Sequence, residues 1–184
     1  MSGSSNYEQN SGALLCLWSK EFFVLTFSII GNGFIGLVGI WKNNNREIII
    51  INVYSPCDME RKRILWQELF NHQRNSSCEL WCLLGDFNSI RYARERIEGS
   101  KVDGGGGGEI SEFNQFIWDM EVEDISLMGR EFMWWRPNGK ARSRLEKIIV
   151  TREWNCTRSG CTQFALDRNI SNHYPILVKN MVVD

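Results

Sequence analysis

The apolar positions of the chain gather into short runs, and one of the first covers residues 22–41 without a single charged side chain. Asn32 lies near its middle between two glycines, and β-branched and aromatic residues fill the sequence on either side. This pattern predicts two strands joined by a Gly-Asn-Gly turn. The alternative is a single membrane span over residues 22–41, because an uncharged run of this length can cross a bilayer.

Further apolar runs predict more strands. Residues 47–54 read EIIIINVY, a nearly continuous β-branched run that is typical of a strand buried on both faces. The remaining predicted strands are residues 79–85, a hairpin over 131–150 with Asn138 and Gly139 at its turn, residues 162–167 and residues 174–180.

Two segments show helical spacing instead. The first follows Pro56, with an apolar face of Leu65, Trp66, Leu69 and Phe70 and a predicted exposed group of Glu60, Arg61, Lys62 and Arg63. The second covers residues 111–121, with Ser111 as candidate N-cap and an apolar stripe of Phe113, Phe116, Ile117 and Met120. The glycine run 104–108 before it predicts a flexible surface loop. It is no phosphate-binding loop, because neither a preceding strand nor a following Lys-Ser/Thr accompanies it.

Strands therefore dominate, with two helices between them. This predicts an α+β or α/β fold, a sandwich of two β-sheets with helices outside. The chain has 184 residues, 43% of them hydrophobic, which is enough for one domain with a real core. We divide it into a poorly defined N-terminal segment, residues 1–21, and one domain over residues 22–184.

Composition narrows the class of protein. The net charge is −1 and the sequence pI is about 6.2, so any nucleic-acid binding must come from a local patch. Six cysteines in a chain of this length favour reduced thiols in an intracellular protein over a disulfide scaffold. Their spacing lacks the paired knuckles of a zinc finger, and the chain has only two histidines.

The first candidate chemistry lies in the stretch WCLLGDFNSI, residues 81–90. Asp86 and Asn88 come directly after a predicted strand, where side chains of a sheet meet solvent. A carboxylate there can hold a divalent cation or take a proton from water. The alternative is a simple Asp-x-Asn turn whose side chains bond their own backbone. Spacing alone favours the turn.

Other positions change this balance when they are taken in order. Tyr54 closes the strand of residues 47–54, Glu146 follows in SRLEK, and His173 stands in SNHYPI. Together with GDFN this ordered set resembles the endonuclease/exonuclease/phosphatase superfamily, and most closely the endonuclease region of LINE-type retrotransposons of plants. The resemblance extends from about residue 31 to residue 178. It implies a DNase I-like four-layer sandwich, two β-sheets face to face with helices outside, and Mg²⁺-dependent phosphodiester hydrolysis.

The resemblance also implies roles for single residues. Asp86 matches the aspartate that activates the attacking water, and Asn88 matches the amide that orients the phosphate. Tyr54 matches a tyrosine that contacts the phosphate, and His173 matches the histidine that stabilises charge on the phosphoryl oxygens. Glu146 stands where the family has an Asp that orients this histidine.

Three departures from the family pattern fall on working positions. Asn172 stands where the family has a metal-linked Asp, and Glu146 adds a methylene to the expected Asp. The family's early block, with its metal-binding Glu, has no counterpart upstream, so the domain is expected to be incomplete at its N-terminus. With Asp86 and a neutral Asn172 as the metal residues, Mg²⁺ binding is doubtful. We therefore expect a degenerate domain with little or no hydrolytic activity.

Two alternatives stay open. One is an active endonuclease that nicks DNA. The other is a non-catalytic remnant that binds nucleic acid or protein, in which Arg91, Arg94 and Arg96 contact phosphates. A solvated loop with Arg–Glu pairs to Glu95 and Glu98 would also explain these arginines. The expected partner is DNA, with no small-molecule cofactor, no membrane and a monomeric chain.

Overall fold

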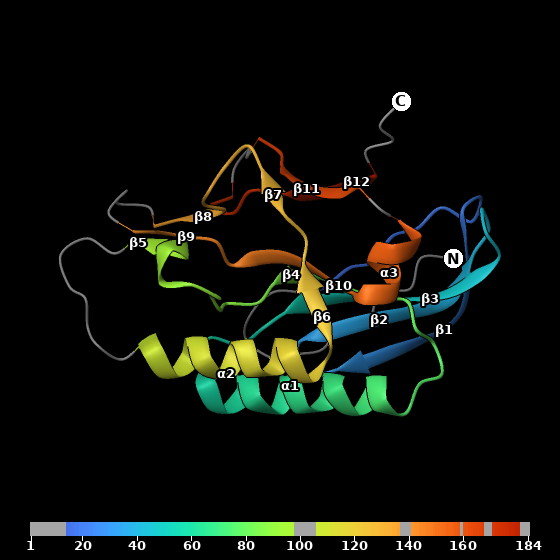
Figure 1. The fold of residues 1–184 in the computed structure, drawn as a ribbon, viewed down its shortest axis with the longest axis horizontal. Helices are drawn as coiled ribbons and strands as arrows, with labels where there is room; N and C mark the ends of the chain where they lie inside the picture. The colour runs from blue at the N-terminus through green and yellow to red at the C-terminus, as the bar shows by residue number, and fades with distance from the viewer. Residues whose placement is uncertain (1–13, 98–105, 137–140, 159, 168–170, 181–184) are drawn as a thin grey trace.

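A six-stranded β-sheet forms the centre of the computed structural model, which describes residues 14–97, 106–136, 141–158, 160–167 and 171–180 (Figure 1). Its strand order is β1-β2-β3-β4-β10-β6. The strands are β1 (Phe23–Gly31), β2 (Phe34–Trp41), β3 (Arg46–Tyr54), β4 (Trp81–Asp86), β6 (Val122–Asp124) and β10 (Glu146–Thr151). β3 and β4 run parallel, and the other neighbouring pairs run antiparallel.

The uncharged run 22–41 forms β1 and β2, as the sequence predicted. Asn32 and Gly33 form the turn between them, and Gly33 has a φ of +87°. The single-helix alternative for residues 22–41 is therefore wrong. Among the described residues, no helix combines the length and the apolar character needed to cross a membrane.

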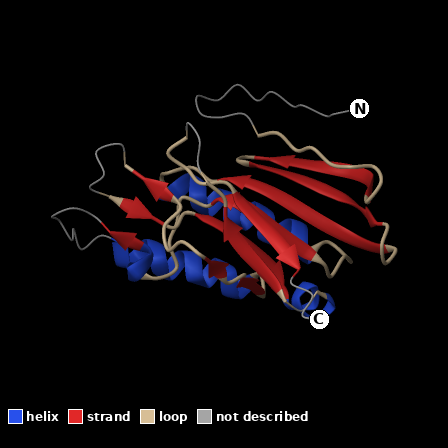
Figure 2. Ribbon diagram, turned by 90° about the horizontal axis from the view of Figure 1, so that it is seen from above, coloured by secondary structure: helices blue, strands red, loops and turns tan. Residues whose placement is uncertain are grey.

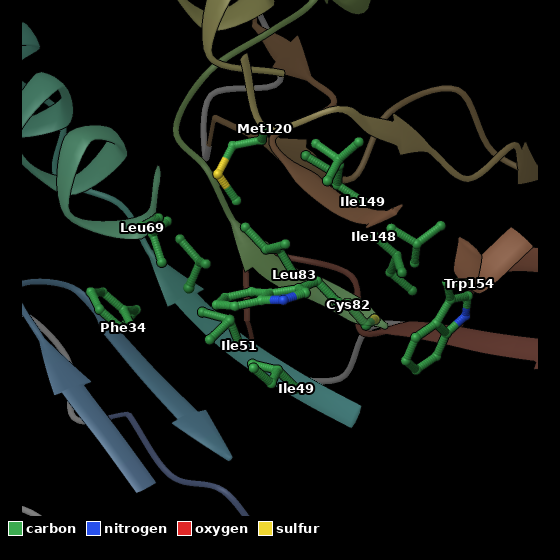
Figure 3. Packing of buried hydrophobic residues seen from close by; sticks show 14 of the residues in the cluster. Phe34, Ile49, Ile51, Leu69, Cys82, Leu83, Met120, Ile148, Ile149 and Trp154 are labelled. Carbon is green, nitrogen blue, oxygen red and sulfur yellow. The ribbon is translucent and has the colours of Figure 1, made fainter. Parts of the chain in front are cut away.

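Two helices cover one face of this sheet and close the main core. α1 (Met59–Arg74) and α2 (Gly106–Asp119) lie side by side on that face (Figures 1 and 2). Figure 3 shows the packing of sheet residues such as Ile49, Ile51 and Leu83 with Leu69 of α1. Between the helices, the rings of Trp66 and Phe116 stack with centroids 5.6 Å apart.

The predicted helices are correct in place and wrong in two details. Lys62 was expected to be exposed, but its side chain is only 2% exposed. α2 begins at Gly106, so Gly106–Gly108 belong to the helix and Ser111 lies inside it instead of capping it. The rest of the glycine run lies outside the described residues.

Two small sheets lie on the other side of the large sheet (Figure 1). One has the order β12-β11-β7, formed by Ile176–Asn180, Cys161–Ala165 and Leu127–Met128. The other has the order β5-β9-β8, formed by Arg96–Ile97, Arg142–Ser143 and Trp134–Trp135. Short helices precede β5 (η1, Ala93–Glu95) and follow β10 (α3, Arg152–Thr157).

The predicted hairpin over residues 131–150 is therefore too long. β8 and β9 do pair antiparallel, but β10 leaves them and inserts between β4 and β6 of the large sheet. All six residues of β10 are buried, which a central strand requires. Asn138 and Gly139 lie outside the described residues.

The segment predicted as poorly defined, residues 1–21, is described from residue 14 onward. Leu14, Cys16 and Trp18 pack against the core, and the side-chain amide of Asn52 donates to the carbonyl of Leu15 at 3.3 Å. Residues 14–18 are therefore in contact with the core.

Candidate active site

Strand register brings three of the predicted residues to one edge of the large sheet. In the parallel pair β3–β4, Tyr54 lies opposite Asp86, and in the antiparallel pair β4–β10, Glu146 lies opposite Asp86. Side chains of directly opposed residues stand about 4.5–5.5 Å apart at Cβ, so this register alone places Glu146 within reach of Asp86.

The end of β4 depends on a glycine. Gly85 has a φ of +131°, and a Cβ there would lie 2.1 Å from the carbonyl oxygen of Val53 on the neighbouring strand. Only glycine fits both the backbone angle and the close approach. Gly85 therefore fixes the position of Asp86 at the end of β4.

The loop that follows has the geometry of an Asp-x-Asn turn. The backbone N–H of Asn88, which has a φ of +46°, donates to Asp86 Oδ1 at 2.8 Å. The Asn88 side-chain amide donates to the carbonyl of Ser55 at 2.5 Å. The turn interpretation is thus correct for the backbone, and it leaves Asp86 Oδ2 directed toward His173.

His173 completes a cluster with the two acids. It precedes β12 and forms an isolated bridge with Trp134 of β8. Its Nδ1 is hydrogen-bonded to Glu146 Oε1 and lies 3.8 Å from Asp86 Oδ2. The hydrogen bond to Glu146 raises the pKa of His173 above its usual value.

The burial of Asp86 has a separate effect on its acidity. Its side chain is 11% exposed. Desolvation raises the pKa of Asp86 to about 6, and the nearby Glu146 charge adds to this; the hydrogen bond from Asn88 and the His173 charge act in the opposite direction. A carboxyl group with a pKa in this range is typical of functional sites.

Tyr54 and Asn172 lie at the outside of this cluster. Tyr54 is exposed, at 38%. Asn172 is exposed and adjacent to His173 in the chain, and its backbone carbonyl accepts a hydrogen bond from Trp135 N–H at 3.2 Å. The structure thus brings Asp86, Glu146 and His173 into contact, with Asn88 beside them and Tyr54 at the rim.

Sequence reasoning missed the support beneath the Asp86 loop. Lys62 Nζ donates to the carbonyl of Asn88 at 2.6 Å and pairs with Glu109 Oε1 at 2.5 Å. Ser89 Oγ donates to the same Glu109 oxygen at 3.2 Å. The signal was present: Lys62 lies three residues before Leu65, in register with the apolar face of α1.

The arginines of the predicted nucleic-acid patch have different environments. Arg91 donates from Nε to Asn114 Oδ1 at 3.0 Å, and the Arg94 guanidinium lies 4.5 Å from the centroid of the exposed Tyr92 ring. Arg96 begins β5.

The alternative of a solvated loop with Arg–Glu pairs does not describe Glu95, whose side chain accepts a hydrogen bond from the backbone N–H of Arg91 at 2.8 Å. Glu95 is buried and forms ion pairs with Arg144 and with the buried Lys147, both at 2.9 Å. Glu98, the other predicted partner, lies outside the described residues.

Asp86, Glu146 and His173 also form a candidate metal site. Each offers one ligand atom, and these atoms all lie within 4.8 Å of one another. The set contains two carboxylates and one imidazole nitrogen. Mg²⁺ prefers oxygen ligands in a nearly octahedral arrangement, so this donor set fits Mg²⁺ poorly.

Comparison with known proteins identifies the fold. No protein-family model matches the sequence, and no curated protein matches it. Among solved structures, the endonuclease domain of TRAS1, a telomere-specific non-LTR retrotransposon, matches with a TM-score of 0.66 at 13% identity, over 100% of this chain and 81% of that chain.

Two bacterial structures match less well but over most of the chain. The mannosyl-6-phosphatase of Bacteroides thetaiotaomicron VPI-5482 gives a TM-score of 0.54 at 13% identity, over 88% of this chain and 68% of that chain. An endonuclease/exonuclease/phosphatase protein from Bacteroides vulgatus gives 0.54 at 12% identity, over 88% and 67%. The chain therefore has the DNase I-like fold of the endonuclease/exonuclease/phosphatase proteins, which confirms the predicted fold class.

Proposed function

We propose that this chain is a DNA endonuclease domain of the retrotransposon type in which Mg²⁺-dependent phosphodiester hydrolysis is strongly impaired. The fold supports the class, because a retrotransposon endonuclease domain is among the structures that it resembles over the whole chain. The side chains that the Asp86 cluster offers to a divalent cation support the impairment.

The proposal assigns proton transfer and charge stabilisation to Asp86 and His173. A pKa of about 6 leaves Asp86 mostly ionised at pH 7, so its carboxylate can accept a proton from an attacking water. The raised pKa of His173 favours the imidazolium ion, whose charge stabilises the negative charge that grows on the phosphoryl oxygens. In this proposal the exposed Tyr54 contacts the phosphate, and the Asn88 amide, which donates to the carbonyl of Ser55, lies beside it.

The cation-binding half is depleted. A divalent metal would neutralise the phosphate and orient the water. Glu146 Oε1 is already bound to His173, and position 172 carries a neutral amide. The donors that remain are two carboxylates, one of them hydrogen-bonded to an imidazole, with the neutral Asn172 beside them. This donor set carries the proposal, because Mg²⁺ prefers several oxygen ligands in a nearly octahedral arrangement.

Nicking of supercoiled plasmid DNA in Mg²⁺ or Mn²⁺ tests the proposal. We expect no nicking above the background of an Asp86→Ala variant. We expect the double variant Asn172→Asp/Glu146→Asp, which restores the family residues at these two positions but not the missing early glutamate, to nick faster than the unmodified chain. Nicking by the unmodified chain that is as fast as that of the double variant, and is abolished by Asp86→Ala, would overturn the proposed impairment.

A second candidate function, nucleic-acid binding without hydrolysis, is favoured by one observation. Glu95 is buried in ion pairs with Arg144 and Lys147, and Arg94 lies over the exposed ring of Tyr92. An arginine stacked on an exposed ring offers both charge and a stacking surface to a nucleic acid. A gel shift that weakens with salt and is lost in Arg94→Ala would support it, and an unchanged shift would exclude this surface.

A further inference from the structure

The cluster that fits Mg²⁺ poorly has the donors that another kind of ion prefers. His173 supplies an imidazole nitrogen, and Asp86 and Glu146 supply one carboxylate oxygen each. An imidazole with two carboxylates is a set that suits borderline-soft ions such as Zn²⁺, and three protein ligands with one open position is a common zinc arrangement.

One of the ligand distances is close to that of a zinc site, and one is shorter. In a tetrahedral zinc site with bonds of about 2.0–2.2 Å, two ligand atoms are roughly 3.3–3.6 Å apart. His173 Nδ1 lies 3.8 Å from Asp86 Oδ2. His173 Nδ1 lies closer to Glu146 Oε1 than two ligands of one zinc ion can lie, so the imidazole would move away by roughly 1 Å on zinc binding. The His173 side chain is 39% exposed and precedes β12, which leaves it room to move.

A second and independent observation concerns the other oxygen of Glu146. The residue is only 6% exposed, and its Oε2 atom has no hydrogen-bond partner in the described part of the chain. A buried carboxylate oxygen without a partner is costly. Glu146 is the first residue of β10 and lies directly opposite Asp86, the last residue of β4. A cation bound between the two acids would satisfy this atom.

The surrounding structure determines the rigidity, the solvent access and the charge of such a zinc site. Asp86 and Glu146 are held by strand pairing and His173 by its bridge to Trp134, so the ligands come from rigid backbone. The exposed side of His173 leaves a path to solvent for a fourth ligand such as water. Metal binding requires the neutral form of the imidazole, so His173 releases its proton on binding; the two carboxylates then give the site a charge of −2, which a divalent ion neutralises.

We propose that Asp86, Glu146 and His173 form a binding site that prefers Zn²⁺ to Mg²⁺. The inference rests on the proposed function in that it concerns the same three residues, and it adds the identity of the ion. A zinc ion there would engage the acid and the histidine that hydrolysis uses, so zinc occupancy and Mg²⁺-dependent nicking exclude each other.

Calorimetric titration of the metal-free protein with ZnCl₂ and, separately, with MgCl₂ tests this inference. Because exposed thiols also bind zinc, the titration uses the full chain with Cys57→Ser and Cys156→Ser, the two exposed cysteines. We expect one zinc ion per chain, with an affinity at least about 100-fold higher than that for Mg²⁺. Cobalt in place of zinc gives a visible absorption spectrum that reports tetrahedral coordination.

Two variants and one control locate the ion. His173→Ala and Glu146→Gln are each expected to weaken zinc binding at least about tenfold. The control His72→Ala removes the chain's other histidine and should leave zinc binding unchanged. His72 lies on α1, where its ring packs against that of Phe34 with centroids 5.9 Å apart. Because His173 is half-exposed, its variant is expected to stay folded even if Glu146→Gln is not.

The outcomes separate this inference from the proposed function. Zinc binding that neither His173→Ala nor Glu146→Gln weakens, or Mg²⁺ binding as tight as zinc binding, overturns the inference. Neither result bears on the plasmid assay, in which Mg²⁺-dependent nicking would overturn the proposed impairment instead.

Discussion

Replacement of Lys62 by alanine should cost far more stability than a lysine on a helix surface suggests. Its ammonium group is buried between α1, α2 and the Asp86 loop, 2.5 Å from Glu109 Oε1 and 2.6 Å from the carbonyl of Asn88. Removal of one partner of a buried pair typically costs about 3–5 kcal/mol, because the other charge stays buried without compensation. Glu109 is 19% exposed and keeps the hydroxyl of Ser89, so we expect the lower end, about 3 kcal/mol.

Urea unfolding followed by tryptophan fluorescence measures this difference. The matched control is Arg63→Ala. Arg63 and Glu112 also join α1 to α2, at 2.6 Å, but both are well exposed and neither is hydrogen-bonded to the Asp86 loop, so the expected loss is about 1 kcal/mol or less. Adding Glu109→Gln to Lys62→Ala should recover part of the loss, because the unpaired charge is then gone. Equal losses in the Lys62 and Arg63 variants would refute the reasoning.

Three further predictions follow from the same geometry. Gly85→Ala should unfold at a clearly lower urea concentration than the unmodified chain, because the new Cβ would lie 2.1 Å from the Val53 carbonyl oxygen. Gly108→Ala should instead stabilise α2 by about 0.5–1 kcal/mol, because nothing lies within 4 Å of the new Cβ. Equal shifts of the urea midpoint in the two variants would contradict this. Because the pKa of Asp86 rises from 3.8 to about 6 on folding, the folded state holds its proton more tightly, so this residue makes stability fall by about 2–3 kcal/mol as pH rises from 4 to 6. Urea midpoints of Asp86→Asn should lack this fall, and an identical pH profile would refute the shift. Burial raises the pKa of the Cys82 thiol to about 12, so a thiol reagent at pH 8 should modify the exposed Cys156 rapidly and Cys82 only on unfolding.

The errors in the sequence reading share one physical origin. The hairpin prediction relied on a local turn signal, and locally it was right for β8 and β9. The strand that follows, β10, is apolar enough to be buried on both faces, and it pairs instead with β4, about sixty residues earlier in the chain. No local pattern encodes which distant strand becomes its partner.

The start of α2 is a second case of the same kind. Glycine has a low helix propensity, so residues 106–108 were predicted as loop. In the folded chain, the carboxylate of Glu109 in the first turn of α2 binds the buried Lys62. This contact with α1, together with the favourable position of an acid at a helix N-terminus, outweighs the glycine penalty.

The sequence by itself determined the strands of the β-branched runs, the apolar faces of the two helices and the acids and histidine of the candidate site, because these follow from periodicity and from the ordered motifs around them. Only the tertiary structure decided that β10 lies beside β4, that Glu146 is bound to His173 and that Lys62 is buried beneath the Asp86 loop. These features depend on contacts between residues far apart in the chain, and such contacts are set by packing and strand register, not by local pattern.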